Sequence, residues 1–273
     1  MTTRLLYLLC LLCAAPALPA LEPPPHNPVP GGVAVLALPD AGVVPPSLHY
    51  QGRPVMTLRH QQQWWAVVGI ALDTEPGWQQ LEQSLNGYAL PPVSFQVRAK
   101  DYPAQYITLR NNNYVEPDPK TQQRIAREAR LREQALNAWS DQLPATLRFI
   151  KPVQGRFSSE FGLRRFFNKK PRRPHSGLDI AAPRGTPIVA PAPGRVVATE
   201  HLFFNGKTVF IDHGQGLVTM FCHLDRIDAR PGQYLQAGES LGVVGSTGRV
   251  TGPHLHWSVT LNGNLVEPRL FLR

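Results

Sequence analysis

Cysteine is scarce in this chain, with three copies among 273 residues. Cys10 and Cys13 both fall within the first 20 residues, so Cys222 alone remains once that segment is set aside. A single thiol excludes an internal disulfide framework of the kind that stabilises small exported domains. The fold must therefore be held by a packed core, which 42% hydrophobic residues permit, or by a metal ion.

Long apolar runs are also missing, apart from residues 5–12. Arg4 precedes this run and small residues follow it, which is the pattern of a secretory signal peptide too short to remain as a membrane span. We expect residues 1–20 to be that signal peptide, cleaved after Ala17 or Ala20, with an uncleaved anchor as the alternative. The mature protein would be exported and would have no stable membrane span.

Acidic residues are outnumbered, with 19 Asp and Glu against 28 Lys and Arg. The formal net charge is +9, and it becomes +8 when Arg4 is removed with the signal peptide. Such a balance suits an acidic partner, namely nucleic acid, anionic lipid or an anionic wall polymer. Export makes nucleic acid the least expected of the three, so we predict no nucleic-acid partner.

Proline and glycine are plentiful, with 28 and 22 copies, and they disfavour long helices. Short strand-like runs separated by turn signals predict a small sandwich-like or barrel-like β domain over residues 21–110. The expected strands are residues 32–38, 54–59, 64–70, 93–98 and 105–109. This region shows no catalytic constellation, and His49 and His60 within it are isolated.

One segment, Lys120 to Trp139, lacks both glycine and proline and is rich in helix-forming residues. Asp118 followed by Pro119 is a good N-cap and first-turn pair, so the sequence predicts one long helix within a connecting region, residues 111–146. Its arginines suit either an anionic surface or, because glutamates interleave with them, a solvated face on a helix that packs between domains. The expected apolar face holds Ile125, Ala129, Leu136 and Trp139.

Residues 147–273 are again turn-rich and show no repeated strand–helix–strand pattern, so a second, mainly β domain is expected there. His254 and His256 lie at the start of a run that reads as a strand, and side chains two apart on a strand share a face. Two adjacent imidazoles disfavour double protonation, which keeps one of them ready to bind metal or accept a proton.

Two further segments add chemistry to this domain. His175 and Asp179, four apart across Ser176–Gly177, suit a loop that enters a strand. Two histidines and one carboxylate are a known ligand set for catalytic zinc, which lowers the pKa of a water molecule to roughly 7. In the strand around His223, alternation predicts that Thr219, Phe221 and His223 share one face. Cys222 would then point away from His223 and be a small buried residue.

The combined pattern resembles the lysostaphin-like family of zinc endopeptidases. The resemblance covers about residues 150–273 and includes Phe161-Gly162-Leu163-Arg164 and the turn Gly185 to Ala190. It implies an antiparallel β-sheet peptidase domain with a substrate groove and one zinc ion held by His175, Asp179 and His256. His223 and His254 would be the catalytic pair that does not bind zinc; spacing alone does not make this division.

The resemblance also has departures. Phe221 stands where the family usually has tyrosine, so a hydroxyl is absent there. His213 matches a family position that looks structural, and His201 matches no family position.

The family cleaves stem peptides or cross-links of peptidoglycan, so peptidoglycan peptides are the expected substrate. The β domain is similar to domains that precede the peptidase in some periplasmic relatives, which makes the periplasm the expected location. The basic loop from Arg164 to Arg173 could pair with substrate carboxylates or be solvated. We expect the N-terminal domain or residues 111–146 to limit access to the groove. The alternatives are a non-catalytic wall-binding regulator of another hydrolase and an anionic-polymer binder that uses the basic loop.

Overall fold

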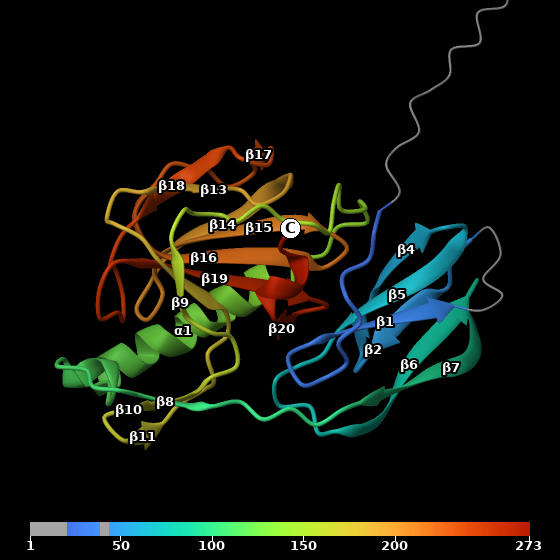
Figure 1. Cartoon of the computed structure of the whole chain (residues 1–273), viewed down its shortest axis with the longest axis horizontal. Helices are drawn as coiled ribbons and strands as arrows, with labels where there is room; N and C mark the ends of the chain where they lie inside the picture. Colours follow the sequence, from blue (N-terminus) through green and yellow to red (C-terminus); the bar gives the residue numbers. More distant parts are fainter. Residues whose placement is uncertain (1–20, 39–43) are drawn as a thin grey trace, which may run out of the picture.

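The computed structural model describes residues 21–38 and 44–273, so the expected signal peptide at residues 1–20 lies outside the described residues. The described chain is mainly β, as predicted, and forms two lobes that lie side by side (Figure 1). No helix in these described residues is long and apolar enough to cross a membrane.

The N-terminal lobe is a sandwich of two antiparallel sheets. One sheet has the order β1-β5-β4, and the other has the order β3-β2-β6-β7. Apolar side chains of both sheets form the core between them, among them Leu38 and Val68 of the first sheet and Tyr50 and Phe95 of the second. The strands are β1 (Val33–Leu38), β2 (Ser47–Tyr50), β3 (Arg53–Pro54), β4 (Met56–His60), β5 (Gln63–Gly69), β6 (Gly77–Leu85) and β7 (Tyr88–Val97).

Two features of this lobe differ from the predicted strands. β6 and the first half of β7 were missed because their polar and proline-containing residues do not alternate with apolar ones, and one face of this sheet is solvent-exposed. The last predicted strand is β8 (Ala104–Ile107), but it does not join the sandwich. It pairs in parallel with β10 (Arg164–Phe167) of the C-terminal lobe, which is also joined to β11 (Lys170–Pro171).

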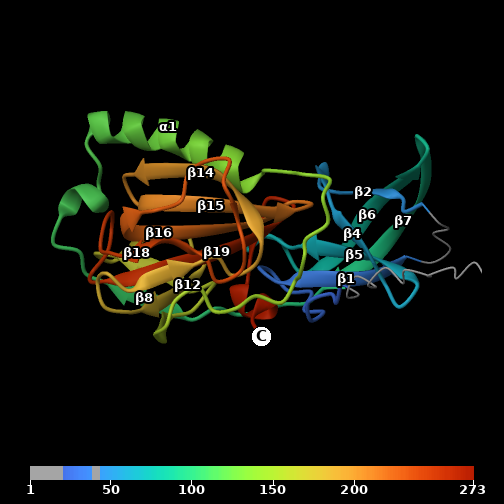
Figure 2. The ribbon, with the colours of Figure 1, turned by 90° about the horizontal axis from the view of Figure 1, so that it is seen from above.

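The predicted helix is α1, Pro119–Leu136, the one α-helix among residues 21–38 and 44–273. Asp118 caps it by accepting a hydrogen bond from the Thr121 N–H at 2.8 Å. The predicted position between domains was wrong, since α1 lies over β14, β15 and β16 of the C-terminal lobe (Figure 2). The predicted apolar face was also wrong in part. The buried residues of α1 are Glu128, Ala135 and Leu136, of which only Leu136 was predicted, and the predicted Trp139 lies beyond the end of the helix. The free-energy cost of burying Glu128 is offset because its Oε2 accepts the Phe203 N–H at 2.6 Å.

The C-terminal lobe is built on a large sheet with the order β17-β14-β15-β16-β19-β12-β9. Met220, Cys222 and Phe210 pack beneath α1 on one face, and the main core cluster covers the other. The strands of the sheet path are β9 (Arg156–Ser159), β12 (Leu178–Ala181), β14 (Gly194–Leu202), β15 (Gly206–Gly214), β16 (Leu217–Ile227), β17 (Tyr234–Leu235) and β19 (His254–Leu261). Strands β13 (Pro187–Val189), β18 (Ser240–Val244) and β20 (Asn264–Val266) are attached to it.

The two lobes share one hydrophobic core. Val33, Met56 and Val67 of the N-terminal lobe belong to the same buried cluster as Val259 and Leu261. Asn262 adds a buried pair of hydrogen bonds to the backbone of Gly69, at 2.7 Å to its N–H and 3.1 Å to its carbonyl. This interface therefore fixes the lobes against each other.

Candidate active site

Strands β12 and β19 place three of the predicted residues on one face of the large sheet. Asp179 is directly opposite His256 in the antiparallel register, and His254 lies two residues before His256. Leu255 and Trp257, between and after the histidines, are fully buried in the main core. The predicted alternation at His254 and His256 is therefore confirmed.

His175 reaches the same point from the loop that precedes β12. Gly177 allows this approach, because a Cβ there would lie 2.4 Å from the Trp257 carbonyl oxygen. His175 Nε2 lies 3.0 Å from Asp179 Oδ1 and 3.0 Å from His256 Nδ1, and the last two atoms are 2.8 Å apart. Three atoms able to bind a metal thus converge, and His175, Asp179 and His256 are all buried.

Hydrogen bonds behind this cluster orient its three side chains. His175 Nδ1–H donates to the Glu160 carbonyl at 2.6 Å and His256 Nε2–H to Ser258 Oγ at 2.9 Å, so the opposite ring nitrogens face inward with lone pairs. Burial lowers the pKa of His256 to about 4, against the opposing effect of Asp179. Burial alone would raise the pKa of Asp179, but the closeness of its carboxylate to the His175 and His256 rings, which is favourable when a ring is protonated, holds that pKa well below its usual value. Two neutral imidazoles and a carboxylate form a donor set that fits zinc.

Arg165 supports the carboxylate from its other side. Its Nη2 lies 2.9 Å from Asp179 Oδ2, and the two side chains are 18% and 10% exposed. Arg165 also donates from Nε to Gln105 of β8 at 3.1 Å and from Nη2 to Ser159 Oγ at 3.3 Å. Sequence reasoning placed Arg165 only in a basic loop, because no local spacing links it to Asp179. The pairing of β8 with β10 brings Gln105 and Arg165 together.

His223 joins the site through a β-bulge in β16. Cys222 and His223 together occupy the place opposite Thr208, and His223 has a φ of +67°. Its ring lies 4.8 Å from that of His254 and 6.0 Å from that of His256. Its Nδ1–H donates to the Thr247 carbonyl at 2.8 Å, and burial lowers the pKa of His223 well below its usual value. His254 Nδ1–H likewise donates to the Gly252 carbonyl at 2.9 Å.

The bulge overturns the predicted faces of this strand. Phe221 and Leu224 both belong to the main core, whereas regular alternation placed them on opposite faces. His223 therefore does not share the face of Phe221, and Cys222 is not separated from His223 by alternation. Cys222 is nevertheless the buried residue expected: burial raises the pKa of its thiol to about 12, and Asn205 Nδ2 donates to its Sγ at 3.3 Å. Phe221 is fully buried in the main core, so a hydroxyl there would face away from the histidines.

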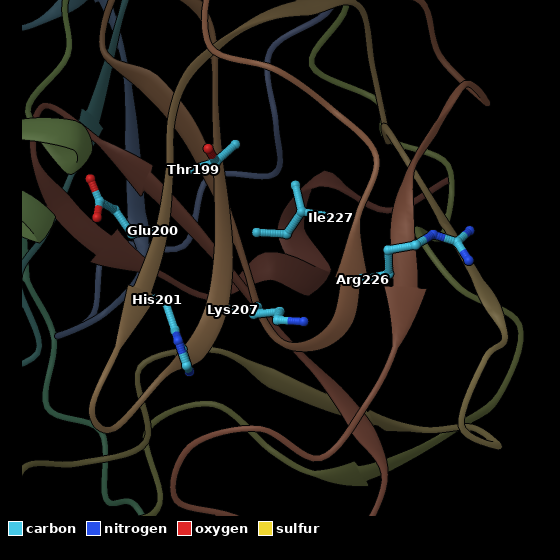
Figure 3. Close-up of a pocket in the computed structure, with 6 residues that line it drawn as sticks. All are labelled: Thr199, Glu200, His201, Lys207, Arg226 and Ile227. Atoms are coloured by element: carbon cyan, nitrogen blue, oxygen red, sulfur yellow. The ribbon is translucent and has the colours of Figure 1, made fainter.

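Two histidines of the C-terminal lobe lie outside the cluster. His213 is buried, with hydrogen bonds to the Pro193 carbonyl and to Thr219 Oγ1, both at 2.8 Å, which agrees with a structural position. His201 lines a surface hollow together with residues of β14, β15 and β16 (Figure 3). The side chains of that hollow do not converge on one point, since Glu200 and Arg226 lie on opposite sides of it. It contains none of the metal-cluster residues.

Comparison with known proteins agrees with this arrangement. The model of peptidase family M23 matches residues 173–268, and that of the peptidase family M23 N-terminal domain matches residues 26–100. A Pseudomonas aeruginosa protein whose crystal structure is described as a peptidase M23 is 45% identical. That match covers 90% of this chain and 95% of the other, with a TM-score of 0.77.

Curated relatives match over shorter segments. DD-carboxypeptidase/endopeptidase Mpg of Neisseria meningitidis is 42% identical over 120 residues, which is 44% of this chain and 28% of the relative. Peptidoglycan DD-endopeptidase ShyA of Vibrio cholerae is 41% identical over 113 residues, 41% of this chain and 26% of the relative. The match thus spans about a quarter of the length of these relatives. With the match over nearly the whole length of the Pseudomonas aeruginosa protein, these findings show that the chain belongs to peptidase family M23.

Proposed function

We propose that the protein is a zinc-dependent endopeptidase that hydrolyses amide bonds in peptidoglycan stem peptides or cross-links. The observation that carries this proposal is the convergence of His175 Nε2, Asp179 Oδ1 and His256 Nδ1. The names of the relatives Mpg and ShyA support the substrate class. One zinc ion would be held by these three residues.

In the proposed reaction, the metal and two histidines have separate roles. When bound, zinc would supply Lewis acidity and lower the pKa of water. His223 and His254 each give their Nδ1–H to a backbone carbonyl, which leaves the Nε2 lone pair able to accept a proton. Either Nε2 is placed to take a proton of the attacking water, and that nitrogen would then give the proton to the amide nitrogen as the C–N bond breaks. The low pKa of His223 keeps its ring neutral before the reaction.

Entry to the site is the second part of the proposal. The side chains of His175, Asp179, His254 and His256 are 0%, 10%, 16% and 6% exposed. The segment that precedes α1 lies against the basic loop beside them: β8 pairs with β10, and Val115 packs with Phe167. We infer that residues 104–117 limit access of a peptide to the site, in line with the predicted role of the region before the peptidase domain.

The proposal includes the organisation predicted from the sequence. Residues 1–20 would be removed as a signal peptide, and the enzyme would act in the periplasm. Residues 21–110, 111–146 and 147–273 would be the β domain, the connecting region with its helix, and the peptidase domain.

The decisive experiment is hydrolysis of cross-linked wall fragments by the purified mature protein. We expect cleavage that a chelator abolishes and added zinc restores, with Asp179→Asn inactive. His201→Ala is the matched control, because His201 lies away from the cluster. If the fragments are bound without any zinc-dependent cleavage, the protein is a wall-binding regulator rather than an enzyme.

A further inference from the structure

Two arginines near the metal-binding residues form no ion pair with a carboxylate in the part of the chain that the structure describes. Among the described residues, Asp179 pairs with Arg165 and Glu116 pairs with Lys170 of the basic loop. Arg172 instead donates to the carbonyls of Pro171 and Val115, at 2.7 and 2.6 Å, and Arg249 donates to the Tyr114 carbonyl at 3.3 Å. A guanidinium has five N–H donors, so neutral carbonyls satisfy only part of each group.

Arg249 is held between the two walls of the site. Its guanidinium carbon lies 4.4 Å from the ring centre of Phe167 and 4.3 Å from that of Phe204. Phe167 is two residues after Arg165 on β10, and so on the same face of that strand. On the other wall, Asn205 follows Phe204, and its carbonyl accepts the His223 N–H at 2.8 Å. Stacking between Phe167 and Phe204 therefore fixes the charge of Arg249 between the strand that carries Arg165 and the residues that hydrogen-bond to the backbone of His223.

Arg172 lies close to Arg249. The two side chains bind the carbonyls of consecutive residues, Tyr114 and Val115, and the Arg172 backbone N–H donates to the Arg165 carbonyl at 2.9 Å. Burial, together with the nearby charges of Arg165 and Arg172, lowers the pKa of Arg249 to about 10. Asp179 neutralises Arg165 and Glu116 lies within reach of the Arg172 charge, but no carboxylate among the described residues forms an ion pair with Arg249. An anion from outside the chain would stabilise this half-buried guanidinium.

We propose that Arg249 and Arg172 form a subsite for a carboxylate of the peptide substrate, which makes the enzyme selective for anionic peptides. This inference rests on the proposed function and names its specificity-determining residues. A carboxylate accepts stronger hydrogen bonds from guanidinium groups than a carbonyl does. A substrate carboxylate would therefore displace the carbonyls of Tyr114 and Val115, and binding would be coupled to movement of the segment before α1.

The test uses the zinc-loaded mature protein and two cross-linked stem-peptide dimers that differ only in whether the carboxyl group next to the cleaved bond is free or amidated. We expect the wild-type protein to favour the free carboxylate by about 10- to 100-fold in kcat/KM, the range for hydrogen bonds to a charged group. Arg249→Gln and, separately, Arg172→Gln should remove this preference through KM, so that the ratio of kcat/KM for the two dimers approaches one, with zinc content unchanged. Arg249→Lys should restore part of it, because the charge remains but the planar fork is lost.

The possible results of this test distinguish a failure of the subsite from a failure of the proposed function. If wild-type protein cleaves neither dimer, the proposed function fails. If it cleaves both equally, the function stands and the subsite is refuted. Equal losses on both dimers in Arg249→Gln and in Arg172→Gln would show a structural role and also refute the subsite. Arg127→Gln, an exposed change on α1, should leave both rates unchanged.

Discussion

Replacing Arg165 by glutamine should weaken zinc binding while the three proposed ligands remain in place. Arg165 Nη2 is the charged partner of Asp179 Oδ2 at 2.9 Å, whereas Asp179 Oδ1 faces the imidazoles. The side chains are only 18% and 10% exposed, so the pair is poorly screened by solvent. Removing one partner of such a buried pair costs about 3–5 kcal/mol when the other charge is left uncompensated.

In the zinc-loaded protein the ion itself offsets part of this cost. Changes in groups that orient metal ligands typically weaken metal binding by about 10- to 100-fold, and we expect Arg165→Gln to fall in this range. The variant should also raise the pKa of Asp179 in the metal-free protein, because a positive neighbour that favours the carboxylate is removed. A proton then competes with zinc more effectively, so the loss of affinity should grow as the pH falls.

The assay is competition for zinc against a chromophoric chelator over a range of pH. Arg164→Gln is the matched control, since the neighbouring Arg164 is exposed and donates to the Tyr102 carbonyl rather than to Asp179. Arg165→Lys should recover part of the affinity. Equal zinc affinity in wild-type protein and Arg165→Gln would refute the argument that this pair holds the ligand.

Three further predictions concern other residues. His223→Ala and His254→Ala should each lower kcat by about 10²- to 10⁴-fold while zinc content stays at the wild-type level, and a loss of zinc would contradict their assignment as non-ligands. Tyr114→Ala, which removes a ring pair with Phe203, should raise kcat/KM by up to about tenfold if the segment before α1 restricts entry; an unchanged or lower value would argue against this. Burial lowers the pKa of His213 to about 4, so the unfolded chain binds its proton first and stability should fall between about pH 6.5 and 4, by at most about 3 kcal/mol. Urea titrations of the metal-free protein should show a smaller decrease for His213→Gln.

Local patterns determined much of this protein. Turn signals and short apolar runs predicted a mainly β chain, and Asp118–Pro119 fixed the start of α1, because caps and turns depend on neighbours in the sequence. Period-two alternation placed His254 and His256 on one face, opposite the buried Leu255 and Trp257. The residue types allowed either a metal site or a proton-transfer site, and the resemblance to the lysostaphin-like family supplied the division into ligands and non-ligands.

Tertiary structure decided the features that depend on distant partners. The bulge at His223 arises from pairing with β15, and it carries the ring to the side of His254 against the simple alternation of β16. Burial of Glu128 depends on the Phe203 N–H, 75 residues away, so the buried face of α1 could not follow from helix periodicity alone. Arg165 reaches Asp179 because β10 lies beside the sheet that carries the metal site. Sequence spacing limits which residues can act together locally, whereas the strand register determines which distant ones meet.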